Sequence, residues 1–391
     1  MSADPSVVYV LPDKMGGAMS IIANLLRYRT RDAFTYRAVL THNRADRETR
    51  FREPLEADAQ TLVEYALPLE NMYAVVRRLQ RAIGTGTGVL VCNDFVEMLL
   101  LSLVESRRTV VQILHGDYDY YYALAASHEP LVHAFVAYSR AVYDNLLKRL
   151  PHRADTIFHL PYGIAIPDTV RRPAAGPLRL IFAGRLDESK GVGDLPEIDR
   201  LLREAGVPVR WTVVGSGPAG PPLRAAWGAA PHVRWISAAT SAEVVALCAE
   251  HDVFVLPSHA EGLSVATVEA MSAGLVPVVS DLPCMEELVE HGRTGLRAPV
   301  RTPPAFAEAI AGLARDRDQL ETISATARQC VVERFDVRAR VEPYQRLYAR
   351  WRELYRPQPA SVFPSFGSRL DQPWIPNAVV RLVRSAIRAV R

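Results

Sequence analysis

The sequence predicts an α/β protein with two domains in series, each built on a parallel sheet that helices cover on both faces. Its 391 residues suit two domains of ordinary size, and 49% of them are hydrophobic, which is enough for two cores. Short, almost continuously apolar runs alternate with longer helical stretches, a pattern typical of buried parallel strands. Residues 166–177, rich in Pro, Gly and Arg, divide this alternation into two cycles.

The first cycle begins with a β-rich run at residues 7–11, and the paired glycines Gly16 and Gly17 then lead into a helix. Further strands are expected over residues 36–40, 89–92, 110–114 and 131–137, and helices over residues 18–29, 73–83, 95–106 and 141–150. This order of strand and helix predicts a first domain over residues 1–166.

The second cycle repeats the pattern and predicts a second domain over residues 177–336. Strands are expected over residues 178–183, 209–214, 233–236, 253–256 and 277–280, with helices that include residues 242–250 and 265–273. Both domains are predicted to be Rossmann-like. Ligands are therefore expected at the carboxyl edges of the strands and in a cleft between the domains.

Charge and cysteine content argue against several classes of protein. The formal net charge is only +3, which does not favour nucleic-acid binding. The four cysteines lack the spacing of a zinc site or a disulfide framework, which fits a reduced, cytoplasmic compartment. The sequence contains no run of eighteen apolar residues, and its first apolar run is short, so neither a membrane span nor a signal peptide is expected.

The most informative segment runs from a strand into a turn and from the turn into a helix. Glu261 lies on the turn and Glu269 about two helical turns later, with seven residues between them. Gly262 would let the backbone pass close to a ligand. The backbone N–H groups at the helix start, including those of Leu263 and Ser264, would attract a phosphate through unpaired donors and the helix dipole.

Two carboxylates placed in this way suit a ligand with many hydroxyl groups, because ionised carboxylates act only as acceptors. Glu261 could bind a sugar, and Glu269 could bind the ribose of a nucleotide on the far side of a diphosphate. In isolation, such a pair is usually a loop charge and an ordinary helix residue. Its place at a strand-to-helix turn, beside a glycine and before the small-residue run 270–274, favours a binding site.

This segment resembles the E-x7-E motif of retaining glycosyltransferase family 4, which has the GT-B fold of two Rossmann-like domains facing a central cleft. Other segments resemble this family's motifs in the same order along the chain. They are Gly16-Gly17, Leu160-Pro161-Tyr162-Gly163-Ile164, Phe182-Ala183-Gly184-Arg185-Leu186 with Lys190-Gly191, and Val214-Gly215-Ser216-Gly217-Pro218. Tyr162 stands where the family usually has Asn. The resemblance is strong over residues 160–300 and looser before them.

The resemblance implies roles for the matching residues of the second domain. Arg185 and Lys190 would neutralise the donor diphosphate, whose charge grows as the sugar bond breaks, and cations aimed at a developing charge contribute strongly to catalysis. Gly184 and Gly215 would lie in the donor-binding turns. The alternative for the two cations is a solvated surface position, which their flanking glycines disfavour.

Further positions follow from the same resemblance. Gly16 and Gly17 would approach the diphosphate from the first domain, with a helix start behind them, and a plain turn is the alternative. His115 ends a strand and would lie beside the transferred sugar, or else be a buried core histidine. Ile236 would hold the nucleobase through backbone groups. Ser237 follows it where the family often has Gly, which leaves the base open.

The family resemblance implies an enzyme that transfers a sugar, with retention, from a nucleotide-diphosphate sugar to a hydroxyl acceptor. The donor would be a UDP-sugar by default, the acceptor a glycan, a lipid-linked or a small molecule, and neither cofactor nor metal would be required. Asp117-Tyr118-Asp119 mimics the D-x-D metal motif of the other glycosyltransferase fold but lies in the first domain. The alternatives are an epimerase or phosphorylase of the same fold, or a non-catalytic relative that binds nucleotide sugars.

The end of the chain is predicted to contain two helices. Residues 337–355 would form a helix that crosses back to the first domain, and residues 356–391 a tail with a basic amphipathic helix. Helices of the second kind commonly lie on anionic membrane surfaces. Residues 373–391 could therefore make peripheral contact with the cytoplasmic face of a membrane or pack on the fold, and both alternatives stay open.

Overall fold

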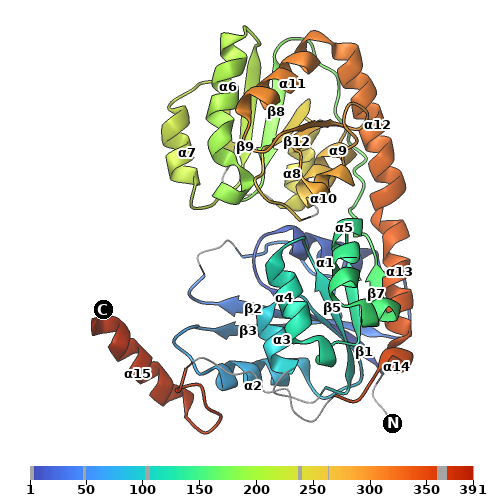
Figure 1. Cartoon of the computed structure of the whole chain (residues 1–391), viewed down its shortest axis with the longest axis vertical. Helices are drawn as coiled ribbons and strands as arrows, with labels where there is room; N and C mark the ends of the chain where they lie inside the picture. The colour runs from blue at the N-terminus through green and yellow to red at the C-terminus, as the bar shows by residue number, and fades with distance from the viewer. Residues whose placement is uncertain are drawn as a thin grey trace. The chain divides into compact units, whose positions relative to one another are not determined.

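The computed structural model describes residues 4–46, 50–101, 106–236, 240–262, 264–358 and 368–390. The chain forms two compact units (Figure 1). The first comprises Met1–Tyr138, Val142–Leu160 and Val341–Arg391, and the second comprises Ser139–Ala141 and Pro161–Arg340. Each unit has its own parallel sheet with helices around it, which confirms the predicted fold class.

The sheet of the first unit has seven parallel strands in the order β3-β2-β1-β4-β5-β6-β7. The strands are β1 Ser6–Pro12, β2 Thr35–Asn43, β3 Ala59–Tyr65, β4 Gly88–Cys92, β5 Arg108–Leu114, β6 Ala134–Ala137 and β7 Ile157–His159. The helices between them are α1 Gly17–Tyr28, α2 Met72–Ile83, α3 Phe95–Leu101, α4 Asp119–Ser127 and α5 Arg140–Arg149, with short 3-10 turns η1 Glu129–Leu131 and η2 Pro151–Thr156. Strands β4 and β5 are buried along their whole length, which explains their continuous apolar sequence.

The sheet of the second unit has six parallel strands in the order β10-β9-β8-β11-β12-β13. The strands are β8 Leu178–Ala183, β9 Val209–Val214, β10 Val233–Ile236, β11 Val253–Leu256, β12 Val276–Ser280 and β13 Leu296–Ala298. The helical elements are η3 Glu188–Lys190, η4 Val192–Asp194, α6 Leu195–Glu204, α7 Gly220–Trp227, α8 Ser241–Cys248, α9 Val265–Ser272, α10 Pro283–Glu286, α11 Pro303–Arg315 and α12 Arg317–Phe335. Helix α6 packs against α11, and α9 packs against α12.

The structure differs from the sequence prediction at the sheet edges. Strands β3, β7 and β13 were not predicted, because β3 is largely exposed and the other two have only three residues each. The strand predicted over residues 131–137 is confined to β6, because the 3-10 turn η1, which contains Pro130, extends to Leu131.

The segment before β8 packs on the second unit, which is why that unit begins at Pro161. The Arg171 side chain is only 3% exposed, and its Nε donates to Asp252 Oδ1 at 3.0 Å. Arg179 makes a second ion pair with Asp252, at 2.7 Å. Burial by itself would raise the pKa of Asp252, but the bonds from Arg179 and Arg171 outweigh it and keep that pKa below its usual value.

The chain returns to the first unit at Val341, within helix α13 (Val337–Ala349). A break at Arg350 separates α13 from α14 (Trp351–Leu354), so the single helix predicted over residues 337–355 is two helices. The last element is α15, Asn377–Val390. None of the helices in the described ranges is both long enough and apolar enough to cross a bilayer.

Candidate functional site

The second sheet changes direction of winding between β8 and β11, and the predicted donor residues follow these two strands. Strand β8 pairs with β9 on one side and with β11 on the other, so the chain after β8 and the chain after β11 leave the sheet side by side. Arg185 and Lys190 follow β8, and Glu261 and Ser264 follow β11. Open α/β sheets bind ligands at such a point, outside the carboxyl ends of the strands.

Backbone contacts lock the two loops together. Gly191 has a left-handed backbone with φ 63°, and a Cβ added there would lie 1.8 Å from the Pro257 carbonyl oxygen. The Ser189 carbonyl accepts a hydrogen bond from the backbone N–H of His259 at 2.8 Å. Only glycine fits at residue 191, and its fit holds Lys190 at a fixed place beside the β11 loop.

Lys190 and Glu261 form an ion pair across these loops. Lys190 Nζ lies 2.5 Å from Glu261 Oε1, and the same oxygen accepts a hydrogen bond from Ser258 Oγ at 2.9 Å. Ser258 is fully buried and Glu261 is only 7% exposed, whereas the Lys190 side chain is 23% exposed. The carboxylate is therefore held rigidly, while the ammonium group keeps access to solvent and to a ligand.

Asp187 organises the β8 loop, although the sequence analysis did not single it out. Its carboxylate accepts from Arg185 Nε, from Ser189 Oγ at 2.5 Å and from the backbone N–H of Lys190 at 3.2 Å. Burial would raise the pKa of Asp187, but the bonds from Ser189 and Arg185 outweigh it and hold the pKa below its usual range. An Asp three residues before the Lys is an N-cap signal that could have identified it.

Helix α9 begins beside this pair, as predicted. Ser264 is its N-cap, and the Ser264 side chain accepts from the backbone N–H of Thr267. The backbone N–H groups of Val265 and Ala266, earlier in the first turn, have no acceptor within the helix and present positive partial charge. Gly262 is buried before the cap, and the predicted residue Leu263 lies outside the described residues.

Glu269 lies on α9 and is 7% exposed. Its Oε1 accepts a hydrogen bond from Ser241 Oγ, and Ser241 is the first residue of α8, the helix that follows β10. The contact connects Glu269 with the part of the chain after Ile236, where the resemblance places the nucleobase. Ser237 lies outside the described residues.

The glycine turn after β9 packs against the loop after β8. A Cβ on Gly215 would lie 1.9 Å from the Gly184 carbonyl oxygen. The backbone N–H of Gly215 donates to the Ile236 carbonyl at 2.8 Å, and that of Gly184 donates to the Val214 carbonyl at 3.0 Å. Close packing of the backbone is by itself enough to require glycine at residue 215. The donor contacts of Gly184, Gly215 and Ile236 stay predictions.

The first sheet has a similar change of direction between β1 and β4. Gly16 and Gly17 follow β1 and begin α1, and His115 follows β5 at the same edge. Asn93 follows β4, where its Nδ2 donates to the Val10 carbonyl at 2.8 Å and its Oδ1 lies 2.7 Å from His115 Nε2. The structure therefore brings His115 to this edge and adds Asn93, which the sequence analysis did not identify.

Glu97 fixes the turn that carries Asn93. Its Oε1 accepts from the backbone N–H groups of Asn93 and Asp94, at 2.8 and 2.6 Å, and its side chain is buried. Burial, with repulsion from Asp94, raises the pKa of Glu97 to about 8. Burial also lowers the pKa of His115 to about 4, with Asp94 acting in the opposite direction. Near neutral pH, His115 is uncharged and Glu97 keeps its proton.

Replacement of Glu97 by Gln is expected to stabilise the protein at alkaline pH. The unfolded carboxyl ionises above its ordinary pKa of 4.5, while the folded carboxyl keeps its proton up to about 8, so the parent loses stability as pH rises through this window. The amide oxygen of the introduced glutamine can still accept both backbone bonds, and the side chain carries no charge. The gain should be on the order of 3 kcal/mol near pH 8.5 and small near pH 5, measured by thermal melting.

Glu308→Gln provides the control, because Glu308 is an exposed residue of α11. It should give the same melting temperature as the parent at both pH values. A Glu97→Gln protein whose stability relative to the parent does not change with pH would show that Glu97 is ionised in the folded state.

The acidic residues of the D-x-D-like segment have structural partners. Asp117 accepts from Tyr122 Oη at 2.6 Å, and Asp119 pairs with Arg149 at 3.2 Å. Within the described ranges, no group of three or more His, Cys, Asp or Glu residues could hold a metal ion. The absence of a metal requirement stays a prediction.

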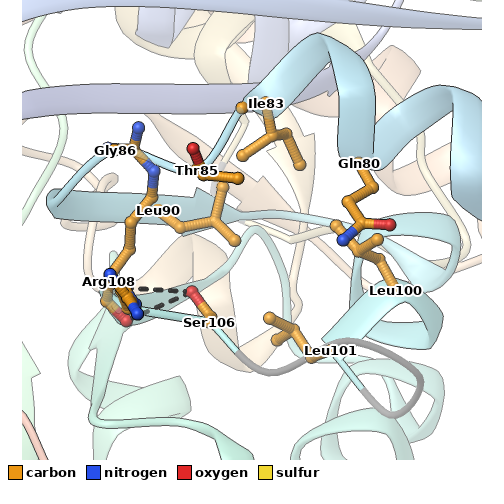
Figure 2. Close-up of a pocket in the computed structure, with 11 residues that line it drawn as sticks. Gln80, Ile83, Thr85, Gly86, Leu90, Leu100, Leu101, Ser106 and Arg108 are labelled. Atoms are coloured by element: carbon orange, nitrogen blue, oxygen red, sulfur yellow. Dashed lines mark hydrogen bonds between the residues drawn. The ribbon is translucent and has the colours of Figure 1, made fainter.

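A cavity of about 360 Å³ in the first unit lies away from these residues (Figure 2). Its walls include Gly86, which precedes β4, and Ser106, which precedes β5, so it opens at the amino ends of the strands. Arg108 lines it, and the Arg108 guanidinium donates to the carbonyls of Ser6 and Thr87 at 3.0 and 2.8 Å. The arginine is thus committed to the fold, and the cavity is separate from the predicted site.

Comparison with known proteins relates the second unit of the chain to glycosyltransferases. Residues 177–316 match the family described as "Glycosyl transferases group 1". The chain is 35% identical over 174 residues to the proposed colanic acid biosynthesis glycosyltransferase WcaL of Salmonella typhimurium, over 42% of this chain and 43% of that protein. It is 28% identical over 274 residues to the GDP-mannose:cellobiosyl-diphosphopolyprenol alpha-mannosyltransferase of Komagataeibacter xylinus, over 65% of this chain and 68% of that protein.

Solved structures share the fold of most of the chain. Anabaena Alr3699/HepE in complex with UDP has a TM-score of 0.68 at 17% identity, over 88% of this chain and 99% of that one. Sucrose-phosphate synthase of Thermosynechococcus elongatus has a TM-score of 0.69 at 14% identity, over 88% and 98%. The chain spans less than half the length of WcaL. The matched domain and the named relatives support a glycosyltransferase, and the chain has the GT-B fold, with a group 1 glycosyl transferase domain at residues 177–316.

Proposed function

We propose that the protein transfers a sugar from a nucleotide-diphosphate sugar to a hydroxyl acceptor, with retention of configuration and without a metal. The observation that carries this proposal is the ion pair of Lys190 with Glu261 at the switch point of the second sheet, beside the start of α9. A cation, a rigid carboxylate and a helix N-terminus together match a sugar joined to a diphosphate.

In this proposal, different residues bind different parts of the donor. Lys190 has three N–H donors and uses one on Glu261, so the others can bind the diphosphate. Arg185, whose side chain is 54% exposed, supplies a second positive charge. Glu261 accepts from hydroxyl groups of the transferred sugar, and Glu269 accepts from the ribose.

The acceptor side is assigned to the carboxyl edge of the first sheet. His115 is uncharged near neutral pH and offers a hydrogen-bonding nitrogen next to Asn93. No side chain of the proposed site is assigned as a covalent nucleophile. We therefore favour attack on the same face as the leaving group, with the leaving phosphate taking the acceptor's proton.

Relatives guide the choice of substrates. Anabaena HepE was solved with UDP, and the Komagataeibacter enzyme takes GDP-mannose and a lipid-linked sugar. UDP-sugar is our first choice of donor because Anabaena HepE, which matches 88% of this chain in structure, was solved with UDP. A lipid-linked or glycan hydroxyl is our choice of acceptor.

A melting-temperature panel tests the proposed function. UDP, GDP, ADP and TDP are each added to the full chain, with the matching nucleosides as controls that lack the diphosphate. One diphosphate should raise the melting temperature by several degrees, since a ligand at about a hundred times its Kd adds about 2.7 kcal/mol of stability. If the melting curve with each of the four diphosphates were the same as the curve of the protein without ligand, the proposal would be contradicted.

A further inference from the structure

Helix α15 belongs to the first unit, and its contacts with that unit lie along one side of the helix. Asn377 Nδ2 donates to Glu70 Oε2 at 2.9 Å, and the Arg384 guanidinium donates to the Glu70 carbonyl at 2.7 Å and to Asp371 Oδ2 at 2.8 Å. Between them, Val380 is fully buried. These residues repeat at helical spacing and define one docked stripe, which leaves the rest of the helix surface uncovered.

The uncovered face of this helix is apolar. Leu382 is 73% exposed, Ile387 50% and Val379 48%, and Trp374, just before the helix, is 74% exposed. At about 100° per residue, Val379 and Leu382 point away from the docked stripe. These four account for four of the nine large hydrophobic side chains that are exposed among the described residues, so the apolar surface is concentrated here.

The charged residues of α15 all have one sign. Arg381 and Arg388 are exposed on α15, and the sequence contains no acidic residue after Asp371. At about 100° per residue, both arginines lie on the side of α15 away from Val379 and Leu382, so the helix has one apolar side and one cationic side. An anionic lipid surface complements both the apolar face and the arginines, since long cationic side chains can reach the headgroups while apolar ones enter the acyl boundary.

We propose that the exposed face of α15, together with Trp374, is a docking surface for membranes that contain anionic lipid. The helix would lie in the plane of the interface, with Val379, Leu382 and Ile387 buried in the lipid. Trp374 would sit at the headgroup level, where tryptophan is enriched. The arginines would contact the phosphates.

The attachment point of α15 gives this docking an orientation. The helix is held by Glu70, in the loop that follows β3. The end of β3 at Tyr65 pairs with Asn43 of β2, close to where β1 ends, so this loop lies at the carboxyl edge of the first sheet. A membrane bound through α15 would therefore hold that edge, which also carries His115, near the lipid surface.

Sedimentation of the full chain with vesicles tests the proposal. Vesicles of phosphatidylcholine with phosphatidylglycerol should bind the protein, and vesicles of phosphatidylcholine alone should bind much less. Leu382→Gln should weaken binding about tenfold, because a buried leucine is lost from the lipid. The double variant Arg381→Gln with Arg388→Gln should weaken binding about twentyfold or more and flatten the salt dependence.

Matched controls lie elsewhere on the surface. Val332→Gln replaces an exposed apolar residue of α12, and Arg210→Gln with Arg315→Gln replaces two exposed arginines of the second unit. Both should bind vesicles like the parent. Equal binding of the parent to neutral and anionic vesicles, or no binding to either, would overturn the proposal. So would a dimer in solution that Leu382→Gln converts to a monomer, because the face would then belong to a second copy.

Discussion

Lys190→Ala is expected to lower kcat/KM by about 10²–10³-fold and to weaken the binding of a nucleoside diphosphate much more than that of the monophosphate. The side chain places a positive charge 2.5 Å from Glu261, at the switch point of the second sheet. Negative charge on the leaving diphosphate grows in the transition state. Removal of the Lys190 ammonium group should therefore lower turnover more than it weakens binding of the ground-state substrate. Calorimetry with both nucleotides, and release of diphosphate from the donor sugar, measure the two effects.

The same substitution leaves Glu261 without its cation, and this structural effect must be separated from catalysis. Among the described residues, Ser258 would remain as the side-chain partner of the Glu261 carboxylate, and the change should cost about 1–2 kcal/mol, because the partly exposed Lys190 makes the pair weaker than a fully buried one. The double variant Lys190→Ala with Glu261→Gln removes the uncompensated charge. It should regain stability but not activity.

Lys148→Ala is the matched control for this experiment. The chain has only three lysines, and Lys148 is exposed in the last turn of α5 in the other part of the fold. Its removal should change neither diphosphate binding nor turnover. A Lys190→Ala protein that binds diphosphate as tightly as the parent would remove Lys190 from the donor site and leave it a purely structural partner of Glu261.

The sequence predicts those parts of the fold that are buried on both faces. Strands such as β4 and β5 are apolar throughout, so periodicity and composition identify them directly. Strand β3 forms one edge of its sheet and its first four residues are exposed, so its sequence carries no such pattern. Edge strands depend on pairing with a neighbour, and that information is not local in the sequence.

The candidate site, like the fold, has residues that the sequence predicts and residues that it does not. Glu261 and Lys190 could be predicted, because both stand beside glycines at strand ends. Their direct pairing depends on the order of strands in the sheet, which places the loops after β8 and β11 together. Asp187 and Asn93 act through backbone and side-chain bonds that form only once the loops have folded. Residues of this kind support the site without matching a motif.

Gly191→Ala is expected to destabilise the second unit by about 3 kcal/mol or more, which is about 10 °C in melting temperature. Two costs add here. The backbone at residue 191 is left-handed, with φ 63°, which costs a residue with a Cβ about 1–2 kcal/mol. The Cβ would also lie 1.8 Å from the Pro257 carbonyl oxygen, so the β8 and β11 loops would have to separate.

Gly193→Ala, two residues further on, is the matched control. A Cβ at Gly193 meets no heavy atom within 4 Å, and its φ lies outside the left-handed range, so this protein should melt within a degree or two of the parent. The comparison also distinguishes two reasons for a glycine beside Lys190. If Gly191 only leaves room for a ligand, Gly191→Ala will lose nucleotide binding at unchanged stability. If it locks the two loops, as the contacts with Pro257 indicate, stability and binding will fall together, because Lys190 and Glu261 can meet only while those loops stay in contact.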